Sequence, residues 1–255
     1  MDIKKIISGV ILFPLFALIL IFGNKYVVDV FISIVAIMGL PEFYKAFKGK
    51  ASPIQWPGYI TAGLICFIHL IPGEYVLPAI TLIILLNLLV LFSEVVIKGM
   101  KKNIVDITIS LFGVCYVVFC LMFAPLIRDS IEDGRILIWY VFFIAWGTDI
   151  FAYLIGKNFG KHKFTEISPN KSIEGCVAGI LGAVLLSMLY TLVCNLVWNT
   201  EISYIYIFGL SIFLSVISQI GDLAASSVKR YCQIKDFSNL IPGHGGILDR
   251  IDSVI

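Results

Sequence analysis

The sequence predicts an all-α polytopic integral membrane protein with about eight transmembrane helices. Hydrophobic residues make up 59% of the 255 positions and charged residues only 14%, and the mean hydropathy is +0.98. Soluble domains carry roughly 45–50% apolar and about 25% charged residues. The apolar residues also form long runs, several of which approach the ~20 residues that cross a ~30 Å hydrocarbon core. These observations place the chain in a lipid bilayer.

Eight apolar runs, taken in order, are interpreted as the membrane helices. The first run follows the charged segment Met1-Asp-Ile-Lys-Lys, as in a signal peptide. No small-residue cleavage site follows the run before Gly23-Asn-Lys25, which favours an uncleaved helix. The second and third are short, so we expect them to be tilted, partly re-entrant or paired as a hairpin. The runs cover 6–22, 27–41, 57–72, 76–97, 104–127, 136–156, 176–198 and 203–221.

The positive charges predict an orientation. With a cytoplasmic N-terminus, sixteen of the nineteen Lys and Arg residues fall in inside segments, and only Lys25, Arg128 and Arg135 fall outside. This asymmetry follows the positive-inside rule. The two longest polar segments, 157–175 and 226–255, then share the cytoplasmic side, where we expect the active site.

No internal repeat, low-complexity tract or linker divides the sequence, so we expect a single integral membrane domain over 1–255. Its first part (1–135) supplies membrane helices and its second part (136–255) carries the polar motifs. The net charge of +2 is too small to favour nucleic-acid binding. The six cysteines form no C-x-x-C pair and are interpreted as small core residues.

The last predicted helix carries a polar stripe on one face, because its polar residues recur every three or four positions. A hydrogen-bonded seam between helices explains the serines. It does not explain Asp222, because a carboxylate near the membrane boundary requires a cation. The stripe consists of Ser211, Ser215, Ser218, Gln219, Asp222 and Ser226.

Two further acids lie near the end of the chain. Asp249 and Asp252 are three positions apart, so in a helical turn both carboxylates point the same way. With Asp222 they can supply three oxygen ligands to Mg²⁺. The alternative is a solvated pair of acids. Arg250, between them, is interpreted as a phosphate clamp or as a counter-ion.

The segment Ile241-Pro-Gly-His-Gly-Gly246 has almost no side chain that would obstruct its backbone. Gly245 and Gly246 would therefore let N–H groups approach phosphate oxygens, and His244 can donate to a phosphate. The alternative is a tight re-entrant turn.

Polar residues also surround the sixth and seventh apolar runs. Lys171, Ser172 and Glu174 directly precede the seventh, where a lysine, a hydroxyl and free N–H groups suit a triphosphate. The alternative is a positively charged loop with a helix cap. One face of the sixth predicted helix carries Asp149, Tyr153, Gly156 and Gly160.

The tail Ser226-x-x-Lys-Arg-x-x-x-x-Lys-Asp-Phe-x-x-x-Ile-Pro-Gly-His-Gly-Gly-x-x-Asp-Arg-x-Asp252 closely resembles the signature of the phosphatidate cytidylyltransferase (CDP-diacylglycerol synthase) family. Three shorter segments are also similar to blocks of this family. They are Asp149-x-x-Ala-Tyr-x-x-Gly156, Ser168-Pro-x-Lys-Ser-x-Glu-Gly175 and Gly221-Asp222-Leu. The similarity covers about the C-terminal half of the chain.

The resemblance implies that CTP and phosphatidate react to give CDP-diacylglycerol and pyrophosphate, with Mg²⁺ required and a second metal or a monovalent cation as an option. It makes Asp222, Asp249 and Asp252 the metal-binding and catalytic acids, with Lys229 and Arg230 as catalytic cations. Further candidate substrate-binding residues are Lys171, Ser172, Glu174, Asp149, Ser226, Lys235, His244, Gly245, Gly246 and Arg250. The expected location is a bacterial inner or plasma membrane, and a homodimer is one assembly that the sequence allows.

The sequence departs from the family pattern in two places. Asn170 stands where the family usually has a basic residue, and Ser172 where it usually has Thr, so a hydroxyl is kept and a charge is lost. Family members also continue past Asp-Arg-x-Asp-Ser into a final membrane helix, whereas this sequence stops at Ile255. The alternative functions are a CTP-dependent lipid kinase, which would release CDP, and a membrane transporter, for which intramembrane acids are also expected.

Overall fold

The computed structural model describes residues 14–241 and 245–254. Within these ranges the fold is all-α, as predicted, and the β pairings are the isolated bridges Lys163–Ser172 and Ile241–Gly245. Six of the described helices are long and apolar enough to cross a membrane, so the chain is an integral membrane protein. They are Lys25–Ala46, Gly73–Lys98, Ile104–Ser130, Gly134–Phe159, Ile173–Val197 and Tyr204–Tyr231.

Two of the eight predicted runs are not among these six spans. The run at 6–22 falls partly outside the described residues, and its described part, 14–22, is helical. The run at 57–72 forms α3 (Trp56–Leu64) followed by the 3-10 helix η1 (Ile65–Leu70). At 1.5 Å per residue these two helices together are too short to cross ~30 Å of hydrocarbon. The prediction that the third run is short is therefore confirmed.

The chain forms two compact units. Unit 1 comprises Met1–Glu132 and Ile234–Arg250, and unit 2 comprises Asp133–Gln233 and Ile251–Ile255. Most of the signature segment, Ile234–Arg250, packs with the N-terminal helices of unit 1. The single integral membrane domain over 1–255 stays a prediction.

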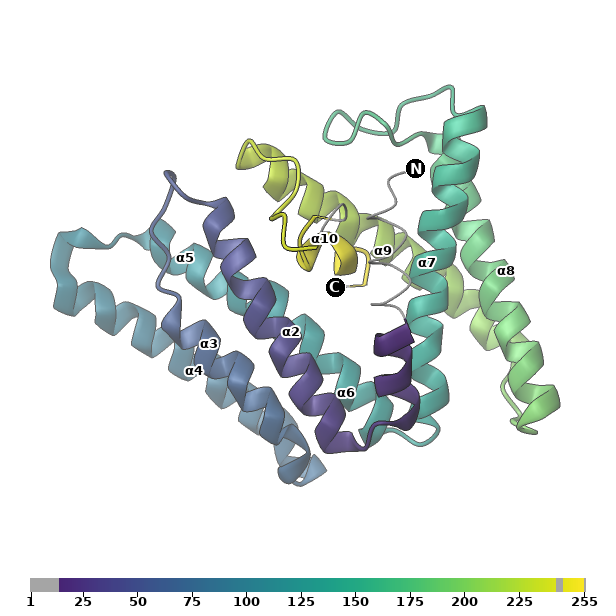
Figure 1. Cartoon of the computed structure of the whole chain (residues 1–255), viewed down its shortest axis with the longest axis horizontal. Coiled ribbons are helices and arrows are strands. Elements are labelled where there is room, and N and C mark those ends of the chain that lie inside the picture. The colour runs from purple at the N-terminus through teal and green to yellow at the C-terminus, as the bar shows by residue number, and fades with distance from the viewer. Residues whose placement is uncertain (1–13, 242–244, 255) are drawn as a thin grey trace. The chain divides into compact units, whose positions relative to one another are not determined.

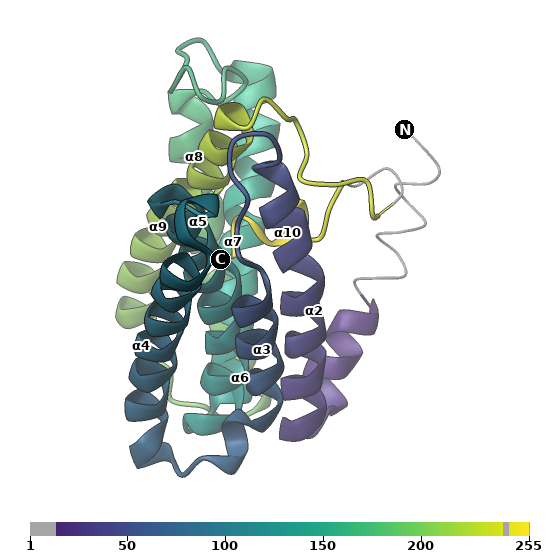
Figure 2. The ribbon, with the colours of Figure 1, turned by 90° about the vertical axis from the view of Figure 1, so that its left-hand side faces the viewer.

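Helix α2 (Lys25–Ala46) is the central helix of unit 1. Asn24 caps it by accepting a hydrogen bond from Val27 N at 2.9 Å. Its buried apolar residues recur at helical spacing, as expected for one face that packs on neighbouring helices; they include Val28, Ile32, Ala36, Leu40 and Phe43. Around this face lie α3, η1, α5 (Ile104–Gly113) and α6 (Cys120–Ser130), while α4 (Gly73–Lys98) packs on α3 and α5 (Figure 2).

The second membrane helix is longer than its apolar run. The run ends at Pro41, but α2 continues to Ala46, so proline removes a hydrogen bond here without ending the helix. Glu42, Phe43 and Tyr44 follow the proline and are all buried. A sequence pattern that stops at the first proline and acid therefore misses the end of α2.

Unit 2 is built on three long helices, α7 (Gly134–Phe159), α8 (Ile173–Val197) and α9 (Tyr204–Tyr231). Figure 1 shows α7 and α8 side by side along most of their length. Glycines allow this approach: a Cβ at Gly182 would lie 2.3 Å from Phe151 Cγ, and one at Gly147 would lie 3.0 Å from Gly182 O. The glycines of α7 and α8 therefore form a helix-packing surface.

The serines of α9 form the predicted seam with their neighbours. Ser211 Oγ lies 2.5 Å from Ser187 Oγ on α8, and Ser215 Oγ lies 2.7 Å from Thr148 Oγ1 on α7. All four side chains are buried. This part of the polar stripe therefore joins helices.

Candidate active site

Lys171 and Asp222 form an ion pair within unit 2. Lys171 ends the loop before α8, where its N–H donates to Ser168 O at 3.0 Å and its carbonyl accepts from Phe164 N at 2.9 Å. These contacts fix the backbone that carries the ammonium group. About a quarter of each ion-paired side chain stays exposed. The prediction that Asp222 requires a cation is confirmed, and that cation is supplied by the loop before α8.

Ser172 is the N-cap of α8. Its hydroxyl accepts a hydrogen bond from Gly175 N at 3.1 Å, and the residue is only 8% exposed. The backbone of Gly160 lies so close that a Cβ there would be 2.5 Å from Ser172 Oγ. The described contacts of Ser172 are therefore those of the alternative interpretation, a helix cap.

Glu174 faces His162 rather than a cation of the Lys171 loop. Its Oε1 lies 2.6 Å from His162 Nδ1, and its Oε2 accepts from His162 N at 3.3 Å. His162 was not among the predicted site residues. The pair connects the start of the loop after α7 with the first turn of α8, so the described contacts of Glu174 are structural.

A second lysine–carboxylate pair lies in the same unit. Lys229 Nζ on α9 donates to Asp252 Oδ2 at 3.3 Å, and both side chains are mostly buried. Burial raises the pKa of Asp252 from 3.8 to about 7, with the negative charges of Asp222 and Asp149 acting in the same direction and Lys229 opposing them. Two other acids of unit 2 therefore act electrostatically on Asp252.

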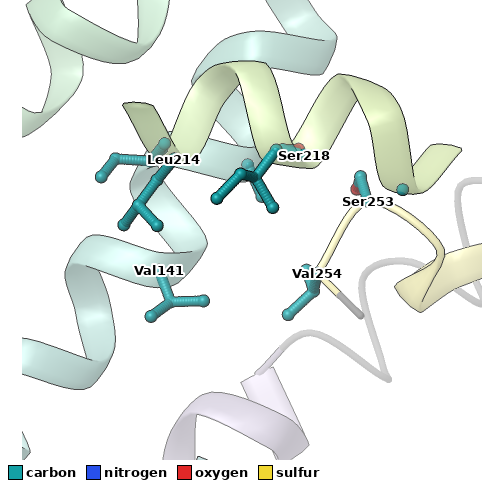
Figure 3. Close-up of a pocket in the computed structure, with 9 residues that line it drawn as sticks. Val141, Leu214, Ser218, Ser253 and Val254 are labelled. Carbon is teal, nitrogen blue, oxygen red and sulfur yellow. The ribbon is translucent and has the colours of Figure 1, made fainter. Parts of the chain in front are cut away.

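A cavity of about 90 Å³ lies beside this cluster, between α7, α9 and the end of the chain (Figure 3). Its wall is mostly apolar and includes Val141 and Leu214, with the hydroxyl-bearing residues Ser218 and Ser253. Ser218 Oγ is buried and has no hydrogen-bond partner among the described residues. Gly221 also lines the cavity, so its wall reaches the residue that precedes Asp222.

Two other predicted residues of α9 lie further along the helix. Ser226, one turn after Asp222, is half-buried. Arg230 is exposed, and its Nε donates to Ile167 O at 3.4 Å in the loop before α8. The guanidinium group of Arg230 thus contacts the same loop as Asp222 does.

The glycine-rich turn belongs to unit 1, and His244 lies outside the described residues. Asp249 Oδ2 accepts hydrogen bonds from Phe237 N at 2.8 Å and Gly246 N at 2.9 Å. The N–H of Gly246 is therefore directed at Asp249 in this structure. Gly245 has a φ of +83° and a Cβ on it would lie 2.9 Å from the same Asp249 oxygen, so its backbone requires glycine.

The remaining basic residues of the tail are solvent-accessible. Lys235 and Arg250 are both exposed, whereas Asp249 is buried. The structure therefore gives Asp249 and Asp252 different partners: Asp249 binds backbone N–H groups of unit 1, and Asp252 binds Lys229 of unit 2.

Among residues 14–241 and 245–254, no group of three or more His, Cys, Asp or Glu has an arrangement that could hold a metal ion. The site formed by Asp222, Asp249 and Asp252 stays a prediction. The carboxylates of unit 2 are of the chemical type that a hard cation prefers, but the pKa of Asp252 is raised first by burial and only second by the negative charge of Asp222.

The sequence did not single out Glu42, a buried acid of α2 that contacts the tail in unit 1. Its carboxyl oxygens accept hydrogen bonds from Ser238, Ile247 and Leu248. The only sequence signal is an acid directly after the proline of an apolar run, which costs free energy in a membrane unless it is satisfied.

The fold and the site define a class: an integral membrane protein whose polar cluster of carboxylates and lysines suits a phosphate-bearing substrate. The chain belongs to the cytidylyltransferase family, whose model matches residues 3–255. The match includes the N-terminal helices, which lie outside the signature segments.

Curated relatives extend the similarity over nearly the whole chain. The phosphatidate cytidylyltransferase of Bacillus subtilis (strain 168) is 33% identical over 259 residues, which cover 99% of this chain and 93% of the relative. The enzyme of the same name from Staphylococcus aureus (strain COL) is 35% identical, with 98% and 93% covered. The one from Staphylococcus haemolyticus (strain JCSC1435) is 32% identical with the same coverage.

Proposed function

We propose that this chain is a CTP:phosphatidate cytidylyltransferase, which transfers CMP from CTP to phosphatidate and releases pyrophosphate. Membership of the cytidylyltransferase family and the names of the relatives support this reaction. The structural observation that carries it is the pair of lysine–carboxylate contacts in unit 2, Lys171–Asp222 and Lys229–Asp252. Such a cluster can hold phosphate groups while it keeps their charge balanced.

The chemistry is an in-line displacement. A phosphate oxygen of phosphatidate forms a bond to the α-phosphorus of CTP, and the bond from that phosphorus to the bridging oxygen of the β-phosphate breaks. Pyrophosphate leaves with the electron pair. The ammonium groups of Lys171 and Lys229 stabilise the charge that develops on the phosphate oxygens, so positioning and electrostatics suffice without a covalent enzyme intermediate.

Mg²⁺ is the expected cofactor. Asp222 and Asp252 are the residues of unit 2 that would hold it, and Asp249 stays a sequence prediction for the same ion. Bound there, the ion would supply positive charge that lets two anionic substrates approach each other. The negative charge of Asp222, which adds to the effect of burial in raising the pKa of Asp252, supports this assignment, because a divalent cation would offset that repulsion.

The site is proposed to open to the cytoplasm, where CTP is available. The distribution of Lys and Arg supports a cytoplasmic N-terminus, and the bacterial relatives support an inner or plasma membrane. Homodimer formation stays a prediction, which the mass of the protein in detergent would decide. The small net charge gives no support for a nucleic-acid partner.

Labelled CTP tests the reaction directly. Purified protein, phosphatidate and Mg²⁺ are incubated with CTP that carries a label either on the α-phosphate or on the γ-phosphate. We expect the α-label in the lipid product and the γ-label in pyrophosphate. Transfer of the γ-label to lipid with release of CDP would instead indicate a lipid kinase, and no CTP turnover at all would favour a transporter.

Asp222→Asn tests the site assignment in the same assay. The substitution keeps the size of the side chain but removes the charge that faces Lys171, so we expect at least a ~100-fold loss of turnover. The amount of folded protein has to be matched. Full activity of this variant would contradict the proposed metal and substrate site.

A further inference from the structure

The carboxyl group of Glu42 holds the backbone of the C-terminal tail within unit 1. Its Oε1 accepts hydrogen bonds from Ser238 Oγ at 2.6 Å and from Ile247 N at 3.0 Å, and its Oε2 accepts from Leu248 N at 3.0 Å. Glu42 is only 5% exposed although it belongs to a membrane-spanning helix. A buried acid is costly there unless it is satisfied, and the tail supplies all three of these donors.

The same carboxyl group explains a glycine of the signature. A Cβ at Gly246 would lie 2.4 Å from Glu42 Oε2 and 2.9 Å from Glu42 Oε1. The N–H of Gly246 itself donates to Asp249 Oδ2 at 2.9 Å. Glu42 therefore packs directly against the backbone that donates to Asp249.

Two neighbours of Glu42 on α2 also contact the tail. A Cβ at Gly39 would lie 3.1 Å from Leu248 Cδ2, and the rings of Phe43 and Phe237 are 6.5 Å apart. Positions 39, 42 and 43 share one helix face. We call Gly39, Glu42 and Phe43 the tail-holding face of α2; it fixes the segment on both sides of the glycine-rich turn.

We propose that Glu42 is a positioning residue for cytidylyl transfer, which fixes the Gly246–Leu248 backbone and through it the carboxylate of Asp249. In this role Glu42 acts through the tail and not through a substrate contact. The inference rests on the proposed function, because the positioned residue belongs to the signature of that reaction. Misplacing a reacting or binding group by about 1 Å can cost roughly 100-fold in rate, so a contact of this kind can control turnover without binding anything.

Glu42→Gln is the principal test. Glutamine keeps the size but replaces one acceptor oxygen by an amide donor, so at least one of the three donors loses its acceptor. We expect kcat to fall by about 10- to 100-fold, while KM for CTP stays within about 3-fold because no substrate contact is removed. Glu42→Asp keeps both oxygens on a shorter side chain and is expected to retain more activity than Glu42→Gln.

Ser33→Ala is the matched control. Ser33 is buried on the same helix, and its hydroxyl donates to Ala62 O at 2.7 Å, away from the tail. We expect some thermal destabilisation from the loss of this hydrogen bond, but kcat within about 2-fold of the unsubstituted protein, because the hydrogen bond of Ser33 does not involve the tail. An equal loss of kcat in both variants would overturn the inference, since the effect would then be one of stability.

Trypsin gives a readout that does not depend on activity. Lys235 and Lys48 are both exposed. Lys235 lies in the C-terminal tail, next to the residues that Glu42 and Phe43 contact, and Lys48 does not. We expect Glu42→Gln to raise the rate of cleavage after Lys235 at least about 5-fold relative to cleavage after Lys48, and Ser33→Ala to leave this ratio unchanged. Unchanged kcat and unchanged cleavage in Glu42→Gln would overturn the inference. An unsubstituted protein without CTP turnover would instead overturn the proposed function.

Discussion

Lys171 contacts Asp222, so an ion pair connects the loop before α8 with the C-terminal half of α9. The two residues belong to separate sequence blocks that the family resemblance brought together. Their contact shows that a polar stripe on one helix and a polar loop before another form one structural feature of unit 2. The contact also makes Lys171 a sensitive position for testing the site.

Replacing Lys171 by glutamine should lower activity far more than stability. The variant leaves Asp222 without its ammonium partner and removes a positive charge from the expected phosphate site, so we expect kcat/KM for CTP to fall at least ~100-fold. Steady-state kinetics with matched protein amounts measure it. Lys163→Gln, at an exposed lysine of the same loop, is the control; an equal loss in this control would contradict a specific role of Lys171.

Asp252 should make the metal-free protein less stable as the pH rises. Its pKa is raised to about 7 in the folded protein, whereas the unfolded chain titrates near the ordinary value of about 3.9. Between these values the folded state binds more protons than the unfolded state, so stability is lost as the pH increases through this window. Asp252→Asn cannot ionise and should lose this dependence.

The measurement is the melting temperature of both proteins in detergent without divalent ions, from pH 5 to pH 8. We expect Asp252→Asn to gain roughly 2 kcal/mol relative to the unsubstituted protein over this range, or about 4–8 °C. Parallel pH profiles of the two proteins would show that Asp252 does not titrate in this window.

Two serines of α9 should respond differently to removal of the hydroxyl. Ser215 is hydrogen-bonded to Thr148, so Ser215→Ala should cost about 1 kcal/mol. Ser218 Oγ is buried without a partner in the described structure, so Ser218→Ala should leave stability unchanged or raise it slightly. Thermal unfolding of both variants checks this; a larger loss for Ser218→Ala would mean that its hydroxyl has a partner, such as a water or a substrate group.

Gly182→Ala should destabilise unit 2 without changing any polar group. The added methyl carbon would lie 2.3 Å from the ring of Phe151, so α7 and α8 would have to separate or the ring would have to move, at about 1–3 kcal/mol. Melting temperature measures the effect. Gly209→Ala on α9, where a Cβ meets no atom within 4 Å, is the control and should be neutral or slightly stabilising.

Much of the architecture could be predicted from residue patterns. Apolar runs predicted the long helices because hydrocarbon thickness fixes their length. The spacing of Ser211 and Ser215 predicted a seam, and the isolated charge of Asp222 predicted a cation. These predictions worked because each depends on local periodicity or on the free energy of a single group.

Contacts between distant segments could not be predicted in the same way. The buried acid Asp29 pairs with His69 at 2.8 Å rather than with a lysine, and Glu42 accepts from residues some two hundred positions later. Nothing in the sequence near Asp29 or Glu42 specifies these partners, because the partners are chosen by the packing of whole helices. For the same reason, the spacing of Asp249 and Asp252 predicted carboxylates that point the same way, whereas in the structure Asp249 contacts Gly246 N and Asp252 contacts Lys229.

The tail-holding face of α2 has a consequence for exchange between relatives. A chimera that receives only a foreign C-terminal signature would place that segment on the Gly39, Glu42 and Phe43 of its host, and a bulkier residue at position 246 would collide with the glutamate. The unit that can be exchanged intact is therefore α2 together with the tail. Substitutions in these two segments are expected to be tolerated in combination more often than singly, although about two hundred residues of sequence separate them.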